Sequence, residues 1–380
     1  MTQKFDYKKL REEDKTLYKQ LLFRVVKLFT GGIQPKSIVD DVYAWAKKNA
    51  GKYYYVDGEN NIAPQWVTRR VIEAAKDRYP ILKISFEEEV LLKKIRGYVI
   101  NADKIDLKIA PDEEELLRQV WFKFDEILTD KVKKSRDNKQ IIVAVSGGAT
   151  LLSISKISSK YRNLLRWHNS SDVTENKKKK VIVCSLTSGG TRDNIAALSD
   201  TVAALIAQEL GVDAHGLLGP AFFNDKRTRD SFKKFPEVKE HVRLVKNADI
   251  ILTSVGDVHN EESLTYKFIK SIDPEYLKDK LKKYEHFADI LYNCYDGCIG
   301  DQIKFSQKIK DRTFFIITCE DLHNMVDSDR KKRTECIVAA LGYNKGYHAM
   351  RGVIAKKMAN HIYMDVECAE GLIKAAEEHG

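Results

Sequence analysis

A short apolar run that leads into a glycine turn constrains this chain more than any other feature. Val181–Leu186 is apolar and largely β-branched, and the small polar stretch Thr187–Asn194 follows it. Apolar residues at helical spacing then extend from Ile195 to Leu210. The pattern predicts a strand covered on both faces, a turn and a helix. Such a turn is either a plain connection or an anion site made of backbone N–H groups.

The composition narrows the class of protein. A length of 380 residues allows two or three domains, and 43% hydrophobic with 32% charged residues is typical of a soluble globular protein. No apolar run approaches the roughly 18 residues of a membrane span, and Met1–Asp6 is polar. We therefore expect a cytoplasmic protein without a membrane partner. Six scattered cysteines, of which only Cys294 and Cys298 are close, predict reduced thiols and no metal site.

The charge alone does not identify a partner. The formal net charge of +10 permits binding to a polyanion. The first 90 residues, however, contain 17 Lys and Arg against 13 Asp and Glu, so the basic excess is not concentrated there.

Residues 1–88 have the element order of a winged helix-turn-helix-like DNA-binding domain. Helical patterns at 14–29, 36–49 and 64–78 precede an apolar run at 80–85 that predicts a short strand. In this layout the third helix enters the major groove. Its exposed side chains would read base edges or hold phosphates: Gln65, Thr68, Arg69, Arg70 and Lys76. The alternative is a small helical domain with an ordinary charged face.

Strands and helices alternate from residue 105 to residue 380. Apolar runs predict strands at 105–109, 140–145, 181–186, 248–255, 313–318, 336–341 and 361–365, with helices between them, including a charged helix over 273–292. This order predicts an α/β domain with a mostly parallel sheet and helices on both faces. Residues 89–104 would form a linking helix and connection.

The carboxyl ends of the predicted strands carry small, hydroxyl and charged residues. In a parallel sheet these ends share one edge, where ligands bind. The segments that would gather there are Gly147–Thr150, Ser188–Asn194, Gly256–Asp257, Gly300–Asp301 and Tyr343–Lys345. Backbone amides, hydroxyls and a lysine suit a phosphorylated small ligand.

Together these turns resemble the SorC (sorbitol-operon regulator) family of bacterial transcription factors. Val143–Leu151 is similar to the family's first strand and phosphate turn, and Gly297–Asp301 to its Gly-x-x-Gly-Asp turn. Ile337–Lys345 and Ala359–Asp365 are similar to its last strands and the lysine-bearing turn between them. Ala63–Val71 looks like the family's recognition helix.

The resemblance implies a Rossmann-like fold related to ribose-phosphate isomerases and glucosamine-phosphate deaminases. It implies a dimer or tetramer that binds double-stranded operator DNA and a phosphorylated sugar effector, without a cofactor or catalytic residues. The effector's phosphate would lie on Gly147, Gly148, Ala149 and Thr150, close to Lys345. The sugar or a second phosphate would contact Gly189, Gly190, Thr191 and Arg192, and the aspartates of the same edge are Asp257 and Asp301.

Two departures from the family pattern keep alternatives open. Ser146–Thr150 lacks the aromatic residue and the arginine usual near the family's first turn, and Gly51–Ile62 separates the second and third helices. One alternative is an isomerase- or deaminase-like enzyme, for which Asp257, Asp301 and His348 are candidate acids or bases by position. The other is a ligand-sensing scaffold that does not bind DNA.

Overall fold

The computed structural model of the chain describes most of the sequence. The described residues are 3–5, 21, 24–25, 35–49, 54–56, 80–135, 139–171, 173–187, 198–284, 286–326, 333–342 and 347–379. The chain divides into two compact units, Met1–Lys93 and Lys94–Gly380. The expected recognition helix, with Gln65, Thr68, Arg69, Arg70 and Lys76, lies outside the described residues.

The described part of the first unit contains helix α3 (Pro35–Asn49) and a short antiparallel pair, β1 (Gln3–Phe5) with β2 (Tyr54–Val56). Ile38, Val42 and Ala46 of α3 are fully buried, which agrees with the predicted helical stripe. The strand predicted at Pro80–Ser85 is wrong, because this segment is the start of helix α5 (Pro80–Tyr98). Proline is well suited to the first turn of a helix, and a short apolar run fits either structure.

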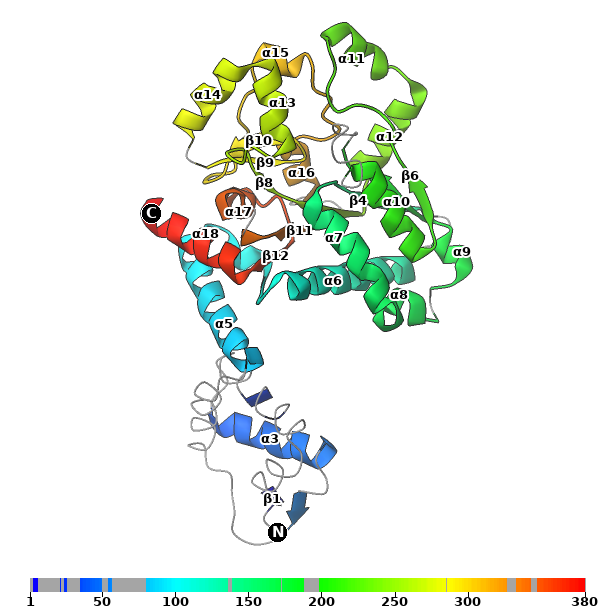
Figure 1. Cartoon of the computed structure of the whole chain (residues 1–380). Helices are drawn as coiled ribbons and strands as arrows, with labels where there is room; N and C mark the ends of the chain where they lie inside the picture. Colours follow the sequence, from blue (N-terminus) through cyan, green and yellow to red (C-terminus); the bar gives the residue numbers. More distant parts are fainter. Residues whose placement is uncertain are drawn as a thin grey trace. The chain divides into compact units, whose positions relative to one another are not determined.

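In the second unit, the described residues form a sheet of seven strands in which every neighbouring pair is parallel (Figure 1). The order is β3 (Asp106–Ala110), β12 (His361–Asp365), β11 (Glu335–Ala340), β7 (Ile250–Ser254), β4 (Ile141–Val145), β5 (Val181–Ser185) and β6 (Asp213–His215). The predicted α/β class is therefore confirmed.

Helices cover both faces of this sheet. One layer contains α6 (Glu113–Lys134), α7 (Ala149–Ile157), α8 (Arg166–Asn169) and α10 (Ser199–Leu210). The other contains α12 (Pro236–Lys246), which contacts β4 and β5, and α18 (Val366–His379), which contacts β3 and β12. The central strands β4 and β5 are buried at every residue, as expected for a sheet covered twice.

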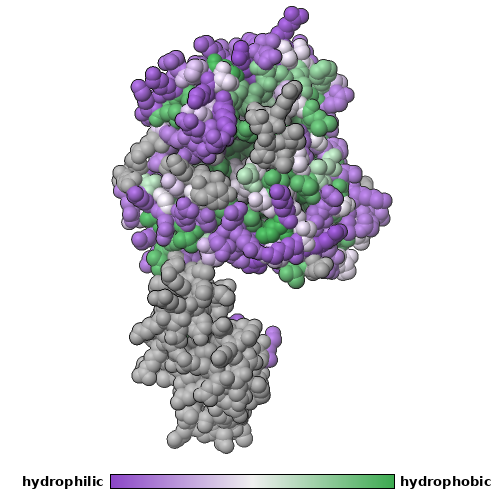
Figure 2. All heavy atoms as spheres, in the orientation of Figure 1, coloured by the Kyte–Doolittle hydropathy of each residue, from purple (hydrophilic) through white to green (hydrophobic). Residues whose placement is uncertain are grey.

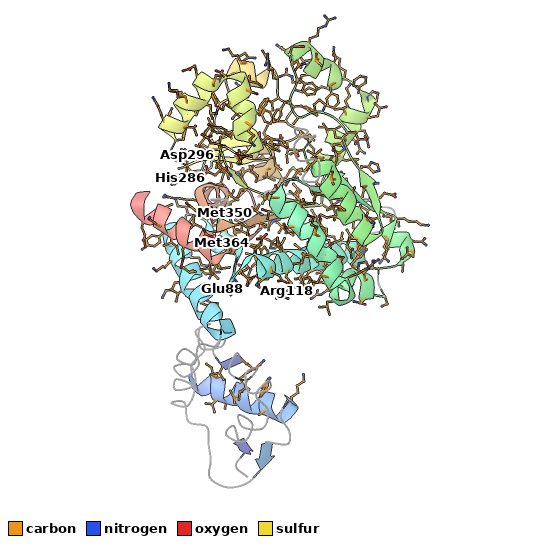
Figure 3. The ribbon with its side chains drawn as sticks, in the orientation of Figure 1. Glu88, Arg118, His286, Asp296, Met350 and Met364 are labelled. Atoms are coloured by element: carbon orange, nitrogen blue, oxygen red, sulfur yellow. The ribbon has the colours of Figure 1, made fainter. Side chains whose placement is uncertain are left out.

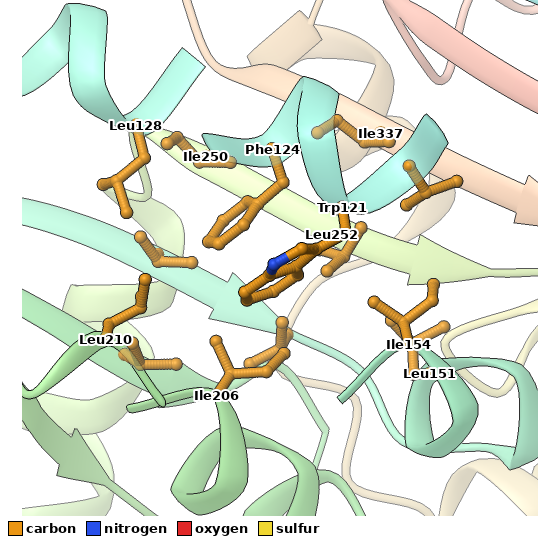
Figure 4. Close-up of a cluster of buried hydrophobic side chains, with 14 of the residues drawn as sticks. Trp121, Phe124, Leu128, Leu151, Ile154, Ile206, Leu210, Ile250, Leu252 and Ile337 are labelled. Carbon is orange, nitrogen blue, oxygen red and sulfur yellow. The ribbon is translucent and has the colours of Figure 1, made fainter. Parts of the chain in front are cut away.

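The core of the first layer is built around α6. Trp121, Phe124 and Leu128 of α6 are completely buried and pack with residues of α7, α10, β7 and β11 (Figure 4). Asp112 begins the helix by accepting a hydrogen bond from the N–H of Glu115 at 2.8 Å. Acidic residues at the helix start and lysines in its last turn complement the helix dipole. On the other side of the sheet, Met350 and Met364 are also fully buried (Figure 3).

A smaller layer follows β7 in the chain. It contains the antiparallel strands β8 (Gly256–Asp257), β9 (Phe287–Ile290) and β10 (Asn293–Asp296), with helices α13 (Leu264–Ile272), α14 (Pro274–Lys283) and α15 (Gln307–Lys310). A separate apolar core that includes Ile269, Phe287 and Phe305 holds it together. On the visible face of the second unit, hydrophilic residues surround small hydrophobic patches (Figure 2).

Two predictions of secondary structure in this region are wrong. The helix expected over Asp273–Tyr292 ends at Lys283, because Phe287–Ile290 pairs as strand β9. The apolar run at 313–318 is buried without forming a strand, and only Thr313 makes a bridge, to Phe222. Phe314 of this run packs edge-on against the Phe232 ring, so its apolar surface leaves water without sheet pairing.

The remaining described elements lie between those already named in the order of the chain. They are η2 (Ala102–Lys104), η3 (Ser158–Leu164), α9 (Glu175–Lys178), α11 (Lys226–Phe232), α16 (Cys319–Val326) and α17 (Tyr347–Ala355). The described residues contain no helix that is both long and apolar enough to cross a membrane.

The Gly-x-x-Gly-Asp turn packs directly on the backbone of α17. Gly300 has φ +78°, and a Cβ atom there would lie 2.3 Å from the carbonyl oxygen of Gly352. Asp301 forms an ion pair with Lys356 at 2.6 Å. The second glycine is therefore required by both conformation and space.

We predict that Gly300→Ala lowers the free energy of unfolding by about 2 to 4 kcal/mol, since it adds backbone strain to an overpacked contact. Urea denaturation measures this change. Gly97→Ala is the matched control, because a Cβ at Gly97 meets nothing within 4 Å and the residue is helical. An equal loss of stability in both variants would contradict the packing argument.

A charged cluster joins the amino ends of three neighbouring strands of the main sheet. His361 on β12 contacts Asp106 of β3 through Nδ1 at 3.0 Å and Glu335 of β11 through Nε2 at 3.2 Å. Burial alone would lower the pKa of His361, but the two carboxylates outweigh it and the pKa is raised. The hydrogen bonds to His361 lower the pKa of Asp106 and of Glu335.

We predict that His361→Gln costs most stability between about pH 4.5 and 6.5. The raised pKa of His361 contributes stability below its unfolded value, about 6.5, which is lost as the pH rises through the folded value. The lowered carboxyl pKa values contribute above about pH 4. Urea denaturation of wild type and variant across this pH range measures the difference. A difference independent of pH, or the same profile in the exposed control His215→Gln, would contradict the prediction.

Candidate functional site

The main sheet has a topological switch point between β4 and β7. The chain leaves β4 through α7 to β5 on one side, while β7 borders β11 on the other. Crevices at such points are the usual ligand sites of open parallel sheets. A cavity of about 620 Å³ opens here, between the carboxyl ends of these strands and the smaller layer.

Residues from five segments line the cavity, and most of them are polar or glycine. The lining residues are Ser146, Gly147, Gly148, Ala149, Thr150, Thr187, Ser254, Val255, Gly256, Asp257, Asn260, Glu262, Ser263, Leu264, Thr265, Lys267, Asp289, Leu291 and Tyr292. The predicted phosphate turn and Asp257 therefore meet in one cavity, as expected from their strand ends.

The first helix end in the cavity belongs to α7. Gly148 is its N-cap at φ +110°, and no side chain caps the helix. Ala149 and Thr150 form its first turn, whose backbone N–H groups have no acceptor within the helix. Two hydrogen bonds hold the start of this turn to β7. The N–H of Ser146 donates to Leu252 O at 3.0 Å, and the hydroxyl of Thr253 donates to Ser146 Oγ at 3.0 Å.

The second helix end belongs to α13, in the smaller layer. Its N-cap, Ser263, accepts a hydrogen bond from the N–H of Tyr266 at 3.0 Å. Leu264 and Thr265 of the first turn line the same cavity as the start of α7. Lys267 also lines it, paired with Glu262 at 2.6 Å. Two helix N-termini on one cavity favour an anionic group there.

Two carboxylates line the same cavity, and one of them, Asp289, hydrogen-bonds to Thr265 in the first turn of α13. Asp257 is 1% exposed, and its Oδ1 accepts hydrogen bonds from the backbone N–H of His259 at 2.8 Å and from Nδ1 of the same residue at 3.0 Å. Asp289 lies on the neighbouring strand β9. Burial, reinforced by the charge of Asp257, raises the pKa of Asp289 to about 6, although a hydrogen bond from Thr265 opposes the shift.

An aromatic side chain completes the wall between the two layers. Tyr292 shares a side-chain hydrogen bond with Thr187, which follows β5, and its ring meets Phe222 edge-on at 5.4 Å. Burial raises the pKa of Tyr292 to about 12, so its phenol stays protonated at neutral pH. The cavity thus combines anion-binding helix ends, carboxylate acceptors and an aromatic surface.

The structure brings together some of the predicted site residues and not others. Gly147, Gly148, Ala149, Thr150 and Asp257 line the cavity. Asp301 lies outside this lining and is paired with Lys356. Gly189, Gly190, Thr191, Arg192 and Lys345 lie outside the described residues, so their part in the site stays a prediction.

The sequence interpretation missed the contribution of the smaller layer. Asp289 and Tyr292 fall within the segment predicted as a charged helix, where an aspartate has no special meaning. The short, mostly apolar segment Phe287–Ile290 was the only strand signal within that range. Ser263 before a helical run was the signal for the α13 N-terminus.

The described residues also bear on catalysis and metal binding. No group of three His, Cys, Asp or Glu side chains in the described ranges could hold a metal ion. The cavity lining contains neither histidine nor cysteine among those residues. Of the candidate bases, Asp257 lines the cavity and Asp301 does not, while the side chain of His348 lies outside the part that the structure describes. The Oδ1 atom of Asp257 already accepts hydrogen bonds from His259.

The comparisons with known proteins agree with this geometry. The family model of sugar-binding domains (Sugar-bind) matches residues 108–297, half of the chain. No curated protein matches the sequence. The full-length sorbitol operon regulator SorC from Klebsiella pneumoniae has a similar structure, with a TM-score of 0.55 and 16% identity over 93% of this chain and 98% of its own.

A transcriptional regulator from Streptococcus pneumoniae shares the fold as well. Its TM-score is 0.54 at 15% identity, over 77% of this chain and 97% of its own. At this identity the two structures show a common fold, while the family follows from the domain model. The chain belongs to the family of sugar-binding domains, and its resemblance to SorC-type regulators is confirmed.

Proposed function

We propose that this chain is a DNA-binding transcriptional regulator whose second unit binds a phosphorylated sugar in the cavity between α7 and α13. One observation carries the proposal: the N-termini of both helices line a single cavity at the switch point of a sugar-binding domain. Backbone N–H groups at a helix start bind phosphate oxygens, and the helix dipole favours negative charge. The carboxylates that line the same cavity can accept hydrogen bonds from sugar hydroxyls.

The regulatory step follows from the two-unit organisation. A sugar phosphate that binds one conformation of the protein more tightly shifts the population towards it. A change in operator affinity then requires that the two conformations differ in their contacts with DNA. We expect the first unit to make those contacts through Gln65, Thr68, Arg69, Arg70 and Lys76. We also expect the protein to act as a dimer or tetramer, as in the resembling family.

We predict that sugar phosphates raise the melting temperature more than their parent sugars do. A ligand at 100 times its Kd stabilises the folded state by about 2.7 kcal/mol. Thr150→Val removes a buried hydroxyl at the α7 N-terminus, and we expect the Kd to rise about tenfold. Thermal-shift titration measures both effects.

Thr129→Val is the matched control for this experiment. Thr129 is completely buried in α6, its hydroxyl has no hydrogen-bond partner, and it does not line the cavity. Its replacement should leave the ligand response unchanged. If parent sugars stabilise the protein as well as their phosphates do, the phosphate site is wrong. Turnover of the sugar phosphate would instead favour an isomerase- or deaminase-like enzyme.

We predict sequence-specific binding to DNA upstream of the protein's own gene, with affinity that falls as salt rises. Arg69→Ala should weaken this complex by roughly 1 to 3 kcal/mol. Arg227→Ala, at an exposed position on α11, is the control and should have no effect. Gel-shift assays at several salt concentrations measure binding. Sequence-blind binding, or none, would favour a ligand-sensing scaffold over a DNA-binding regulator.

A further inference from the structure

One residue that lines the cavity, Asp289, has surroundings that phosphate binding does not explain. Asp289 lies directly opposite Gly256 in the β8–β9 ladder, and both residues line the cavity. A Cβ atom at position 256 would lie 2.5 Å from Asp289 Oδ1, closer than real contacts allow. The carboxylate therefore occupies the space that any side chain at position 256 would need.

The carboxylate is also held in place from two sides. The Thr265 side chain and the backbone N–H of Tyr292 hydrogen-bond to it. That N–H lies in a tight turn, since Leu291 and Tyr292 have φ values of 56° and 63°. The two residues form the loop of the β9–β10 hairpin, and two-residue hairpin loops require such left-handed angles. The buried amide of Asn293 fixes the turn by donating to Leu291 O at 3.2 Å and to Ile317 O at 2.9 Å.

Asp289 keeps capacity for a ligand. An ionised carboxylate offers about four acceptor positions, and Thr265 and Tyr292 use two of those on Asp289. Burial raises its pKa to about 6, so the fold retains this acid although charging it is unfavourable. A carboxyl group that lines a cavity although its ionisation there is unfavourable is a candidate binding group.

The cavity is also polarised. The α7 N-terminus attracts an anion, while the carboxylates of Asp257 and Asp289 repel one. A ligand with an anionic group at one end and hydrogen-bond donors at the other can satisfy both walls in a single orientation. Inorganic phosphate has no sugar hydroxyl groups to reach the carboxylates while it lies at the helix end, so it uses the anion site alone.

We propose that Asp289 is the specificity-determining residue of this site, accepting hydrogen bonds from the hydroxyl groups of the sugar while the phosphate lies at the α7 N-terminus. This inference rests on the proposed sugar-phosphate function. It assigns the selection among sugars to the β9 strand of the smaller layer.

The test compares Asp289→Asn with wild type by isothermal titration, using inorganic phosphate and a panel of aldose and ketose phosphates as probes. The amide has nearly the same shape but loses the charge and part of the acceptor capacity. We expect the tightest sugar phosphate to bind at least tenfold more weakly, while inorganic phosphate binds equally well or slightly better. Asp279→Asn, an exposed acid on α14, is the matched control and should bind like wild type.

Gly256→Ala provides a second variant, because its methyl group must displace the Asp289 carboxylate. It should show the same selective loss. Unchanged sugar-phosphate affinity in Asp289→Asn would overturn this inference and leave the proposed function standing. An equal loss for sugar phosphate and inorganic phosphate would also overturn it, because Asp289 would then be only structural. If wild type binds no probe, the proposed function itself fails.

Discussion

The pairing of β4 with β7 is the contact on which the rest of the second unit depends. These two strands are neighbours in space although more than 100 residues separate them in sequence, and their partners diverge to opposite sides of the sheet. Because the chain continues to opposite sides from these two strands, no connection crosses over their carboxyl ends, and the cavity opens there. The bonds from Ser146 to Leu252 and from Thr253 to Ser146 fix the two ends against each other. The position of the glycine turn follows from this pairing.

Burial on both faces explains why the central strands could be predicted from sequence. Ile141–Val145 and Val181–Ser185 are continuous apolar runs of strand length, and glycines follow both closely. Gly148 was recognisable as a turn residue, and its φ of +110° accounts for its identity. Parallel order and the shared edge then brought the phosphate turn and Asp257 together correctly.

Prediction failed where tertiary contacts chose between structures that the local pattern allowed. Pro80–Ser85 fits a strand or a helix start, and 313–318 is buried without a sheet partner. Within 273–292, lysines at helical spacing hid the short, mostly apolar segment that becomes β9. That error concealed the lining residues Asp289 and Tyr292. The role of Asp289 depends on an antiparallel pairing with Gly256 that only the fold reveals.

The charge pattern of the cavity supports the proposed function. Helix ends from two layers line one cavity and favour an anion there, and the carboxylates of Asp257 and Asp289 line the same cavity. Since α13 and β9 belong to one layer and α7 to the other, a ligand that contacts all three would link the layers. Such a link is a physical route by which a small sugar phosphate can favour one conformation of the protein.

A crystal structure with the sugar phosphate that stabilises the protein most tests this account most directly. The account predicts phosphate oxygens within about 3 Å of the backbone nitrogens of Ala149 and Thr150, with the sugar directed towards β9. A phosphate bound outside this cavity, or a sugar phosphate in the reverse orientation with its phosphate against Asp289, would contradict it.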